Sequence, residues 1–363
     1  MGGNLDAHPP GGTEGDNRGA TGAAAAGSGE TADSGNVSGS GSVPPPAGPE
    51  NGLENGPESG VGPASPLLGT LVEVQRRTAT VAGDDGAFYQ CQYSPTIDLT
   101  GFSNFAVGDR IHFIRAGSQQ EAMITAIQPR TSKISRPGPM DRRMDELILA
   151  ANVDALVVVT TPARPDFNPR MVDRYLALAE IFNIDAIICM NKVDLDDKLP
   201  AELNYLRGLG YPVVSVSAKA ETGLDELRKA LNGIKVVLSG PSGVGKSSLI
   251  RKLIPGAEPG VGDVRKGDGK GRHTTTSSNL YRHDGICIID TPGIRELGIV
   301  GVSRLELAQY WRDFRPFLQN CKFRDCAHKS EPGCAVLEAV ASGKLPDFRY
   351  QSYLRIQESM EEE

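Results

Sequence analysis

Residues 240 to 247 read G-P-S-G-V-G-K-S and fit the phosphate-binding pattern G-x-x-x-x-G-K-[ST]. An apolar run, Lys235 to Ser239, precedes the pattern, and a helical pattern follows it, which is the context that the motif requires. In such a loop the glycines let backbone N–H groups surround a phosphate, and the positive end of the helix points at the same charge. A glycine-rich turn with a chance lysine would not explain this context. The sequence therefore predicts nucleotide binding.

The loop assigns roles to two of its side chains. We expect Lys246 to neutralise the β- and γ-phosphate oxygens and Ser247 to offer its hydroxyl to Mg²⁺. The residues expected to contact the nucleotide here are Gly240, Pro241, Ser242, Gly243, Val244, Gly245, Lys246, Ser247 and Ser248.

Apolar runs alternate with amphipathic stretches from about Leu147 onward. This alternation is typical of a mostly parallel α/β sheet with helices on both faces, and phosphate ligands of such sheets bind at the carboxyl ends of the strands. We expect strands at 155–159, 186–190, 213–216 and 235–239, and helices at 169–182, 200–209 and 224–231.

Two further motifs follow predicted strands and point to guanine: N-K-x-D at 191 to 194 and S-A-K at 217 to 219. The carboxylate of Asp194 can accept hydrogen bonds from N1–H and the exocyclic amine of guanine, whereas adenine presents an acceptor at N1. The S-A-K sequence one strand later is typical of a loop whose backbone N–H supports guanine O6. Alone, the N-K-x-D motif could be a polar turn at the end of a strand. Together with the S-A-K motif and the phosphate-binding loop, it predicts GTP and GDP as ligands. The residues involved are Asn191, Lys192, Val193, Asp194, Ser217, Ala218 and Lys219.

The sequence D-T-P-G at 290 to 293 ends another apolar strand and fits D-x-x-G. We expect Asp290 to hold a Mg²⁺-bound water and the N–H of Gly293 to sense the γ-phosphate, with Thr275 or Thr276 as a Mg²⁺ ligand in the GTP state. Ile294 follows, where many GTPases carry a glutamine that orients water, so intrinsic hydrolysis should be slow. His273 could supply the missing alignment, or could be a structural histidine of the switch.

The order of these motifs is unusual, because the base-reading motifs precede the phosphate-binding loop. We therefore predict a circularly permuted P-loop GTPase domain, which is tolerable because nucleotide contacts depend on position in space. Two rival interpretations remain: an ATP-using P-loop enzyme, against which Asp194 argues, and a nonenzymatic RNA-binding protein with a vestigial site, against which Lys246, Ser247 and Asp290 argue.

The N-terminal part divides at about residue 65. Before it, Gly, Ala, Ser and Pro dominate, and eight acidic residues stand against Arg18 alone, so we expect a disordered acidic tail over 1–65. Five short β-rich runs between Gly69 and Arg130 indicate either a small barrel of the OB type or a generic β-module. We predict an OB-fold module over 66–130, the GTPase domain over 131–300 and a last module over 301–363.

Four metal-ligand side chains crowd into the last module, in the pattern Cys321-x₄-Cys326-x-His328-x₅-Cys334. Three thiolates and one imidazole suit one closed, structural Zn²⁺ site and leave no open position for catalysis. Lys322, Arg324 and Lys329 surround the cluster and either contact phosphates or form a solvated basic face. Helical patterns near 305–311, 335–341 and 348–360 complete a small helical zinc-binding module.

No stretch of the chain is apolar for long enough to cross a bilayer, and the acidic tail lacks the features of a transit or signal peptide. The remaining 298 residues balance 37 basic against 37 acidic side chains, so any nucleic-acid contact must come from local patches. We expect a soluble protein in a reducing, cytoplasmic setting.

The order N-K-x-D, S-A-K, G-P-S-G-V-G-K-S-S, R-H-T-T-T and D-T-P-G, followed by C-K-F-R-D-C-A-H-x₄-G-C, resembles the small ribosomal subunit biogenesis GTPase family, called RsgA or YjeQ, over roughly residues 68 to 355. The resemblance implies that the OB-fold, GTPase and zinc modules engage the small ribosomal subunit and its rRNA during late maturation, and that the ribosome stimulates hydrolysis. Separately from the resemblance, we expect a monomer with no membrane or DNA partner, although the sequence leaves the oligomeric state open. The acidic tail departs from the family pattern and has no assigned role.

Overall fold

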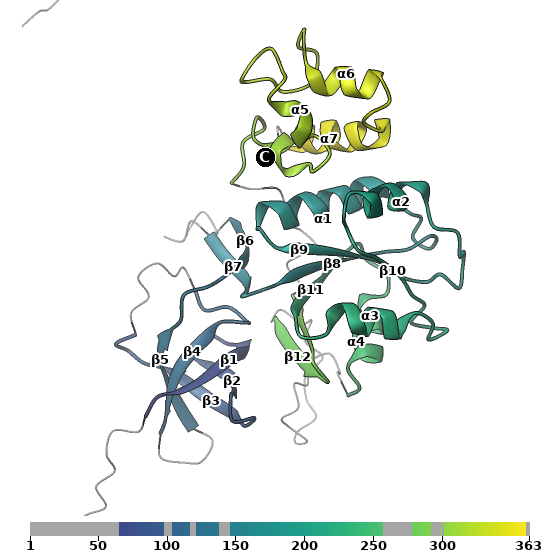
Figure 1. Ribbon diagram of the computed structural model, residues 1–363. Coiled ribbons are helices and arrows are strands. Elements are labelled where there is room, and N and C mark those ends of the chain that lie inside the picture. Colours follow the sequence, from purple (N-terminus) through teal and green to yellow (C-terminus); the bar gives the residue numbers. More distant parts are fainter. Residues whose placement is uncertain are drawn as a thin grey trace, which may run out of the picture. The chain divides into compact units, whose positions relative to one another are not determined.

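The computed structural model describes residues 65–97, 104–116, 121–137, 146–256, 278–291, 299 and 301–360 of the chain (Figure 1). Within these ranges it contains a β-barrel, a mostly parallel sheet with helices on both faces, and a helical module that carries the cysteine and histidine cluster. No helix among the described residues is both long enough and apolar enough to span a membrane.

The barrel forms because apolar side chains alternate along four of its five strands, whereas β1 is buried continuously at its centre. In β2, β3 and β4 every second residue is buried, as expected for strands with one face toward a core. Strand β1 pairs with both β2 and β4, which closes the order β1-β2-β3-β5-β4 into a barrel of the OB type. The strands are β1 (Leu67–Val74), β2 (Thr78–Gly83), β3 (Phe88–Tyr93), β4 (Arg110–Arg115) and β5 (Glu121–Ile127).

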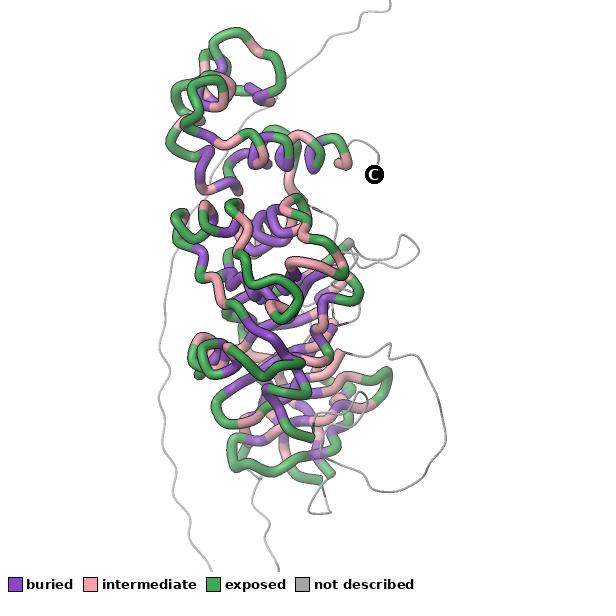
Figure 2. Tube along the Cα trace, turned by 90° about the vertical axis from the view of Figure 1, so that its right-hand side faces the viewer, coloured by how far each residue is buried: buried purple, intermediate pink, exposed green. Residues whose placement is uncertain are grey.

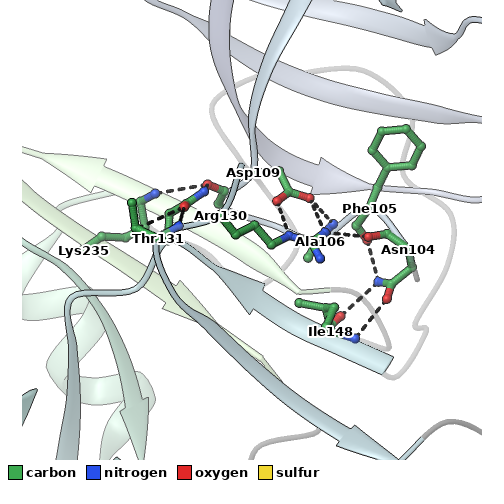
Figure 3. A network of polar contacts seen from close by, with 10 residues as sticks. Asn104, Phe105, Ala106, Asp109, Arg130, Thr131, Ile148 and Lys235 are labelled. Carbon is green, nitrogen blue, oxygen red and sulfur yellow. Dashed lines mark hydrogen bonds and ion pairs between the residues drawn. The ribbon is translucent and has the colours of Figure 1, made fainter. Parts of the chain in front are cut away.

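A buried polar network joins the barrel to the following segment (Figure 3). Arg130 donates to both oxygens of Asp109 at 2.7 and 2.8 Å, and the Asp109 side chain is fully buried. The Asn104 side chain bonds the backbone N–H and C=O of Ile148 at 2.9 and 3.0 Å, and the Lys235 ammonium reaches the carbonyl of Gly108 at 3.1 Å. The barrel is therefore fastened to the GTPase sheet by side chains as well as by the chain itself.

The central sheet has the strand order β10-β9-β8-β11-β13-β12, in which the first five strands are parallel and β12 is antiparallel. Strand β8 is buried at every position, as is typical of a strand covered on both faces. Helices α1 and α2 cover one face and α3 and α4 the other (Figure 1), and Figure 2 shows the buried residues along the strands between them. The strands are β8 (Ala155–Thr160), β9 (Asp185–Met190), β10 (Val213–Ser215), β11 (Lys235–Ser239), β12 (Asn279–His283) and β13 (Ile286–Asp290). The helices are α1 (Pro169–Ile181), α2 (Ala201–Gly208), α3 (Leu224–Leu231) and α4 (Lys246–Leu253).

The C-terminal module packs on α1 through an aromatic cluster and a buried ion network. The Trp311 ring lies 5.6 Å from that of Tyr353, measured between centroids, and both join the core cluster that includes α1. Arg349 donates to both oxygens of Asp313 at 2.9 Å and to Asp173 of α1, and all three side chains are buried. The module is therefore attached to the GTPase sheet by more than its linker. Its elements are η2 (Leu307–Tyr310), α5 (Arg315–Leu318), α6 (Ala335–Ala341) and α7 (Asp347–Ser359).

The structure differs from the sequence-based expectation in four places, one of which is the short helix α5, which the sequence did not predict. The helix expected at 305–311 is a 3₁₀ turn, Leu307–Tyr310, because Trp311 adopts an extended backbone conformation. Two strands, β6 (Lys133–Pro137) and β7 (Glu146–Ala151), form an unpredicted antiparallel pair. Strand β12 was also missed, although Asp284-Gly285, both with positive φ, is a hairpin-turn signal that could have revealed it.

Candidate nucleotide-binding site and zinc centre

The predicted nucleotide motifs meet at one edge of the sheet, because each follows the carboxyl end of a parallel strand. The loop at 240–247 follows β11, the N-K-x-D motif follows β9, and the S-A-K motif follows β10. Asp290 is the last residue of β13, next to β11. Motifs separated by up to 99 residues in sequence, from Asn191 to Asp290, thus lie along the same edge of the sheet.

The phosphate-binding loop requires glycine at positions where the chain approaches its neighbours. Gly245 has φ 96°, and a Cβ there would lie 2.4 Å from the side-chain nitrogen of Asn191. A Cβ on Gly240, φ 139°, would lie 2.2 Å from the Val159 carbonyl oxygen. Lys246 begins α4, is buried, and its ammonium contacts the carbonyls of Gly240 and Pro241 at 2.5 and 2.8 Å. The lysine charge is therefore held inside the curve of the loop.

The guanine-recognition motif is tied directly to the phosphate-binding loop. Asn191, only 1% exposed, donates from its side chain to the Val244 carbonyl at 2.8 Å and accepts from the N–H of Ala218 at 3.1 Å. Lys192 donates to the carbonyl of Gly243 at 2.6 Å and to that of Arg164. The Asn191 side chain thus links the N-K-x-D motif, the S-A-K loop and the phosphate-binding loop, and holds the predicted base-binding residues in place beside that loop.

The carboxylate of Asp194 is exposed and oriented by the S-A-K loop. The hydroxyl of Ser217 donates to Asp194 Oδ1 at 2.5 Å and accepts from the N–H of Ala220 at 2.9 Å. The Val193 N–H bonds the Val216 carbonyl at 3.2 Å, which holds the two loops together. A fixed, exposed carboxylate at this place can accept the paired donors of guanine.

The metal-binding part of the predicted site is described only in part. Ser247 is exposed at the start of α4, and Asp290 pairs in register with Asn279, the first residue of β12. The hydroxyl of Thr291 is buried and has no partner among the described residues. The other predicted residues of this part, His273, Thr275, Thr276 and Gly293, lie outside the described residues.

The four predicted zinc ligands come together in the C-terminal module. Nδ1 of His328 lies 3.6 Å from the sulfur of Cys321 and 3.4 Å from that of Cys334, and the two sulfurs are 4.0 Å apart. Ligands at ordinary Zn–S and Zn–N distances on a tetrahedron are separated by about 3.8 Å (S–S) and about 3.6 Å (S–N). All four ligand atoms, including that of Cys326, lie within 4.8 Å of one another. The cluster therefore fits one zinc ion bound through Nδ1.

The surroundings of the cluster also suit a structural metal. Burial lowers the pKa of His328, which favours the neutral imidazole that binds metal. The hydroxyl of Tyr350 bonds the His328 carbonyl at 2.8 Å, and that of Tyr353 bonds the Ala327 carbonyl at 3.1 Å. Helix α7 thus supports the backbone of the ligand loop.

Sequence reasoning missed one segment that contacts the candidate nucleotide site, the segment between β8 and α1. The Arg164 carbonyl holds Lys192, and the Thr161 hydroxyl bonds the Pro165 carbonyl at 2.7 Å. Asn168 then caps α1 by accepting from the N–H of Arg170 at 3.2 Å. The Asn-Pro sequence at the start of α1 was a readable helix-start signal, but nothing in the sequence connected Arg164 with Lys192.

Fold and site together define a class of protein, the circularly permuted P-loop GTPases. A family model described as RsgA GTPase matches residues 127–300. The curated small ribosomal subunit biogenesis GTPase RsgA of Pseudomonas aeruginosa is 40% identical over 317 residues, which cover 86% of this chain and 88% of that protein. The protein of the same name from Chlorobaculum parvum is 38% identical over 82% of this chain and 99% of its own length.

Solved structures support the same assignment. The crystal structure of YjeQ from Thermotoga maritima is 28% identical, with a TM-score of 0.64 over 81% of this chain and 98% of that one. The structure of YloQ, described as a circularly permuted GTPase, is 26% identical, with a TM-score of 0.63 over 82% and 96% of the two chains. This chain belongs to the RsgA family of GTPases and is a GTP hydrolase.

Proposed function

We propose that this chain hydrolyses GTP to GDP and phosphate during late maturation of the small (30S) ribosomal subunit, and that the subunit stimulates hydrolysis. The observation that carries the proposal is the 40% identity, over 86% of the chain, to proteins named for small ribosomal subunit biogenesis. The OB-type barrel and the zinc-binding module flank the GTPase sheet as two further surfaces for rRNA, since such barrels are a common platform for oligonucleotides.

In this proposal the described residues bind and orient GTP. Lys246 and the N–H groups of the loop 240–247 hold the β- and γ-phosphates, because a lysine charge and a helix N-terminus both favour negative charge. Ser247 and Asp290 would hold Mg²⁺, which would supply positive charge against the negative charge of the transferred phosphoryl group. Asn191, Lys192 and the S-A-K loop fix the guanosine end.

The remaining assignments concern residues outside the described ranges and rest on the motifs alone. We propose Thr275 or Thr276 as the switch ligand of Mg²⁺ and the N–H of Gly293 as the γ-phosphate sensor. His273 is the candidate for aligning the attacking water, since Ile294 has no polar group for that purpose.

Replacement of Asp194 by asparagine should shift base preference from guanine toward xanthine, because an amide can pair with the 2-oxo group of xanthine. The N1–H and exocyclic amine of guanine would lose an acceptor at this position, which costs about 1 to 3 kcal/mol, so the preference for GTP should fall between about 5-fold and about 100-fold. The measurement is kcat/KM for GTP and XTP with the same protein preparation.

The matched control for this change is Asp197→Asn, which removes another exposed carboxylate from the same loop. This variant should keep the wild-type preference. Equal GTP preference in Asp194→Asn and wild type would refute the proposed role of Asp194.

Ile294 supports a second candidate, a nucleotide-regulated RNA-binding protein with little intrinsic turnover. Both candidates bind GTP and rRNA, and they differ only in whether the partner completes the catalytic site. Under the first, we further propose a monomeric cytoplasmic protein with no membrane or DNA partner.

The test is hydrolysis of GTP and ATP by the purified full chain, alone and with small ribosomal subunits, at several defined salt concentrations because phosphate contacts are salt-sensitive. We expect slow GTP turnover that rises at least about 100-fold with the subunit, as partner-supplied groups achieve in other GTPases, and no ATP turnover. Binding of the subunit in the GTP state without any rise in turnover would favour the second candidate. If the subunit neither binds to the chain nor stimulates hydrolysis, the ribosomal assignment is refuted.

A further inference from the structure

Phe323 is an exposed aromatic side chain in the zinc-binding loop. Its side chain is 41% exposed. Among the described residues the other exposed large hydrophobic side chains are Phe88, Leu195 and Leu305. Phe323 lies between two zinc ligands, Cys321 and Cys326. The core of the module is formed by other aromatic rings, so Phe323 is not needed for packing there.

The ring is presented by a restrained backbone. Cys321 and Cys326 bracket only four residues, and both belong to the ligand cluster. The N–H of Lys322 bonds the carbonyl of Gly333 at 3.0 Å, and a Cβ on Gly333 would lie 3.1 Å from the Lys322 Cβ. A preformed loop loses little entropy when its side chain binds a partner, so an exposed ring here is suited to recognition.

Positive charges flank the ring. The Lys322 ammonium lies over one face of the Phe323 ring, 5.5 Å from its centroid, and Arg324, the residue after Phe323, is exposed. The carboxylate of Glu331 accepts N–H groups of the loop, from Ala327 and Lys329 at 2.8 Å and Ser330 at 3.1 Å, so its charge is used within the loop. Asp325 is therefore the acidic residue in this stretch whose charge partly offsets those of Lys322 and Arg324.

We propose that Phe323 is a stacking platform for one unpaired base of RNA, with Lys322 and Arg324 placed for the adjoining phosphates. An aromatic face next to cations is the combination that binds single-stranded nucleic acid, because bases stack on the ring while the cations contact the backbone. The inference rests on the proposed ribosomal function and adds to it the chemical class that the zinc loop recognises.

The alternative occupant of such a ring is an apolar pocket on a protein. Two cations beside the ring favour RNA, because a buried protein interface tends to be depleted of lysine at its centre. Replacement of Phe323 by leucine distinguishes an RNA base from a protein pocket, because the two partners require different side-chain shapes. A leucine keeps the apolar volume that a protein pocket requires and removes the flat face that a base requires.

The test measures the affinity of the zinc-loaded full chain for small ribosomal subunits and for short single-stranded RNA, over a series of salt concentrations. Phe323→Ala should weaken both affinities between about 5-fold and about 100-fold without changing the slope of affinity against salt, because stacking releases no counterions. Phe323→Trp should bind as wild type, and Phe323→Leu should bind as weakly as alanine. Lys322→Ala or Arg324→Ala should reduce the salt slope by about 1.

The matched control is Leu305→Ala, which removes an apolar side chain of similar exposure, 49%, from the same module and should change neither affinity. Zinc content and GTP turnover without ribosomes should stay at wild-type values in every variant. Wild-type affinity in Phe323→Ala or in Phe323→Leu overturns the inference, and so does failure of the wild-type chain to bind either RNA. If single-stranded RNA depends on Phe323 but subunits neither bind nor stimulate hydrolysis, the proposed function fails and the stacking site stands.

Discussion

Replacement of Arg349 by alanine is expected to lower the free energy of unfolding by about 3 to 5 kcal/mol, the usual cost of removing one partner from a buried ion pair. For a chain of this size the thermal midpoint should fall by about 10 °C. The measurement is thermal and denaturant unfolding of the zinc-loaded protein, with zinc content determined in parallel.

The size of this effect follows from the burial of all three charges. The side chains of Arg349, Asp173 and Asp313 are 2%, 0% and 2% exposed. Burial raises the pKa of Asp173, whereas the Arg349 charge favours its ionised form. Without the guanidinium, two carboxylates would share a dry interface with no counter-charge, and neither could stay ionised without a large desolvation cost.

Two further variants separate lost charge compensation from lost packing. The triple replacement Arg349→Met, Asp173→Leu and Asp313→Leu should recover most of the stability, because apolar residues often replace a buried ion network at no net cost. Arg315→Ala removes a half-exposed partner of Glu180 at the same interface and should cost less than about 1 kcal/mol. An Arg349→Ala protein as stable as wild type would show that this network does not hold the zinc module in place.

The sequence predicted strands and helices well wherever the apolar residues formed a clear pattern, either a regular repeat or a continuous run. Alternation located the barrel strand Arg110–Arg115, and a continuous apolar run located Ala155–Thr160. The motifs also predicted which strand ends meet, since carboxyl ends of parallel strands share an edge. The sequence therefore predicted the fold class, which the structure confirms, and the strand ends at which the candidate site lies.

Contacts between distant side chains could not be predicted in the same way. Arg349 and Asp173 are 176 residues apart, and each alone looks like an ordinary charged residue of a surface helix. The structure packs the zinc module on α1, a contact that no residue pattern in the sequence indicated. The contact of Lys192 with Arg164 was hidden for the same reason, because a backbone acceptor leaves no trace in residue type.

Replacement of Lys246 by alanine is expected to reduce GTP turnover at least about 100-fold, the scale seen when one pre-organised group that stabilises transition-state charge is removed. Lys246 sits inside the phosphate loop and its ammonium can exchange the Gly240 and Pro241 carbonyls for phosphate oxygens. The charge that develops on the transferred phosphoryl group would lose its nearest fixed cation. The loss should appear mainly in kcat, measured with and without small ribosomal subunits, if the lysine acts on the transition state more than on bound GTP.

The matched control is Lys252→Ala, which removes a lysine from the same helix. That side chain is 42% exposed and pairs with Glu221. Turnover in this variant should equal that of wild type, and both variants should keep the zinc and the thermal midpoint of the parent. Retained turnover in Lys246→Ala would mean that the backbone N–H groups and Mg²⁺ carry the phosphate charge without it, and the loop would then be a binding element more than a catalytic one. A parallel loss in both lysine variants would instead trace the effect to α4 as a whole, because only a structural change in the helix would be common to a buried lysine and an exposed one.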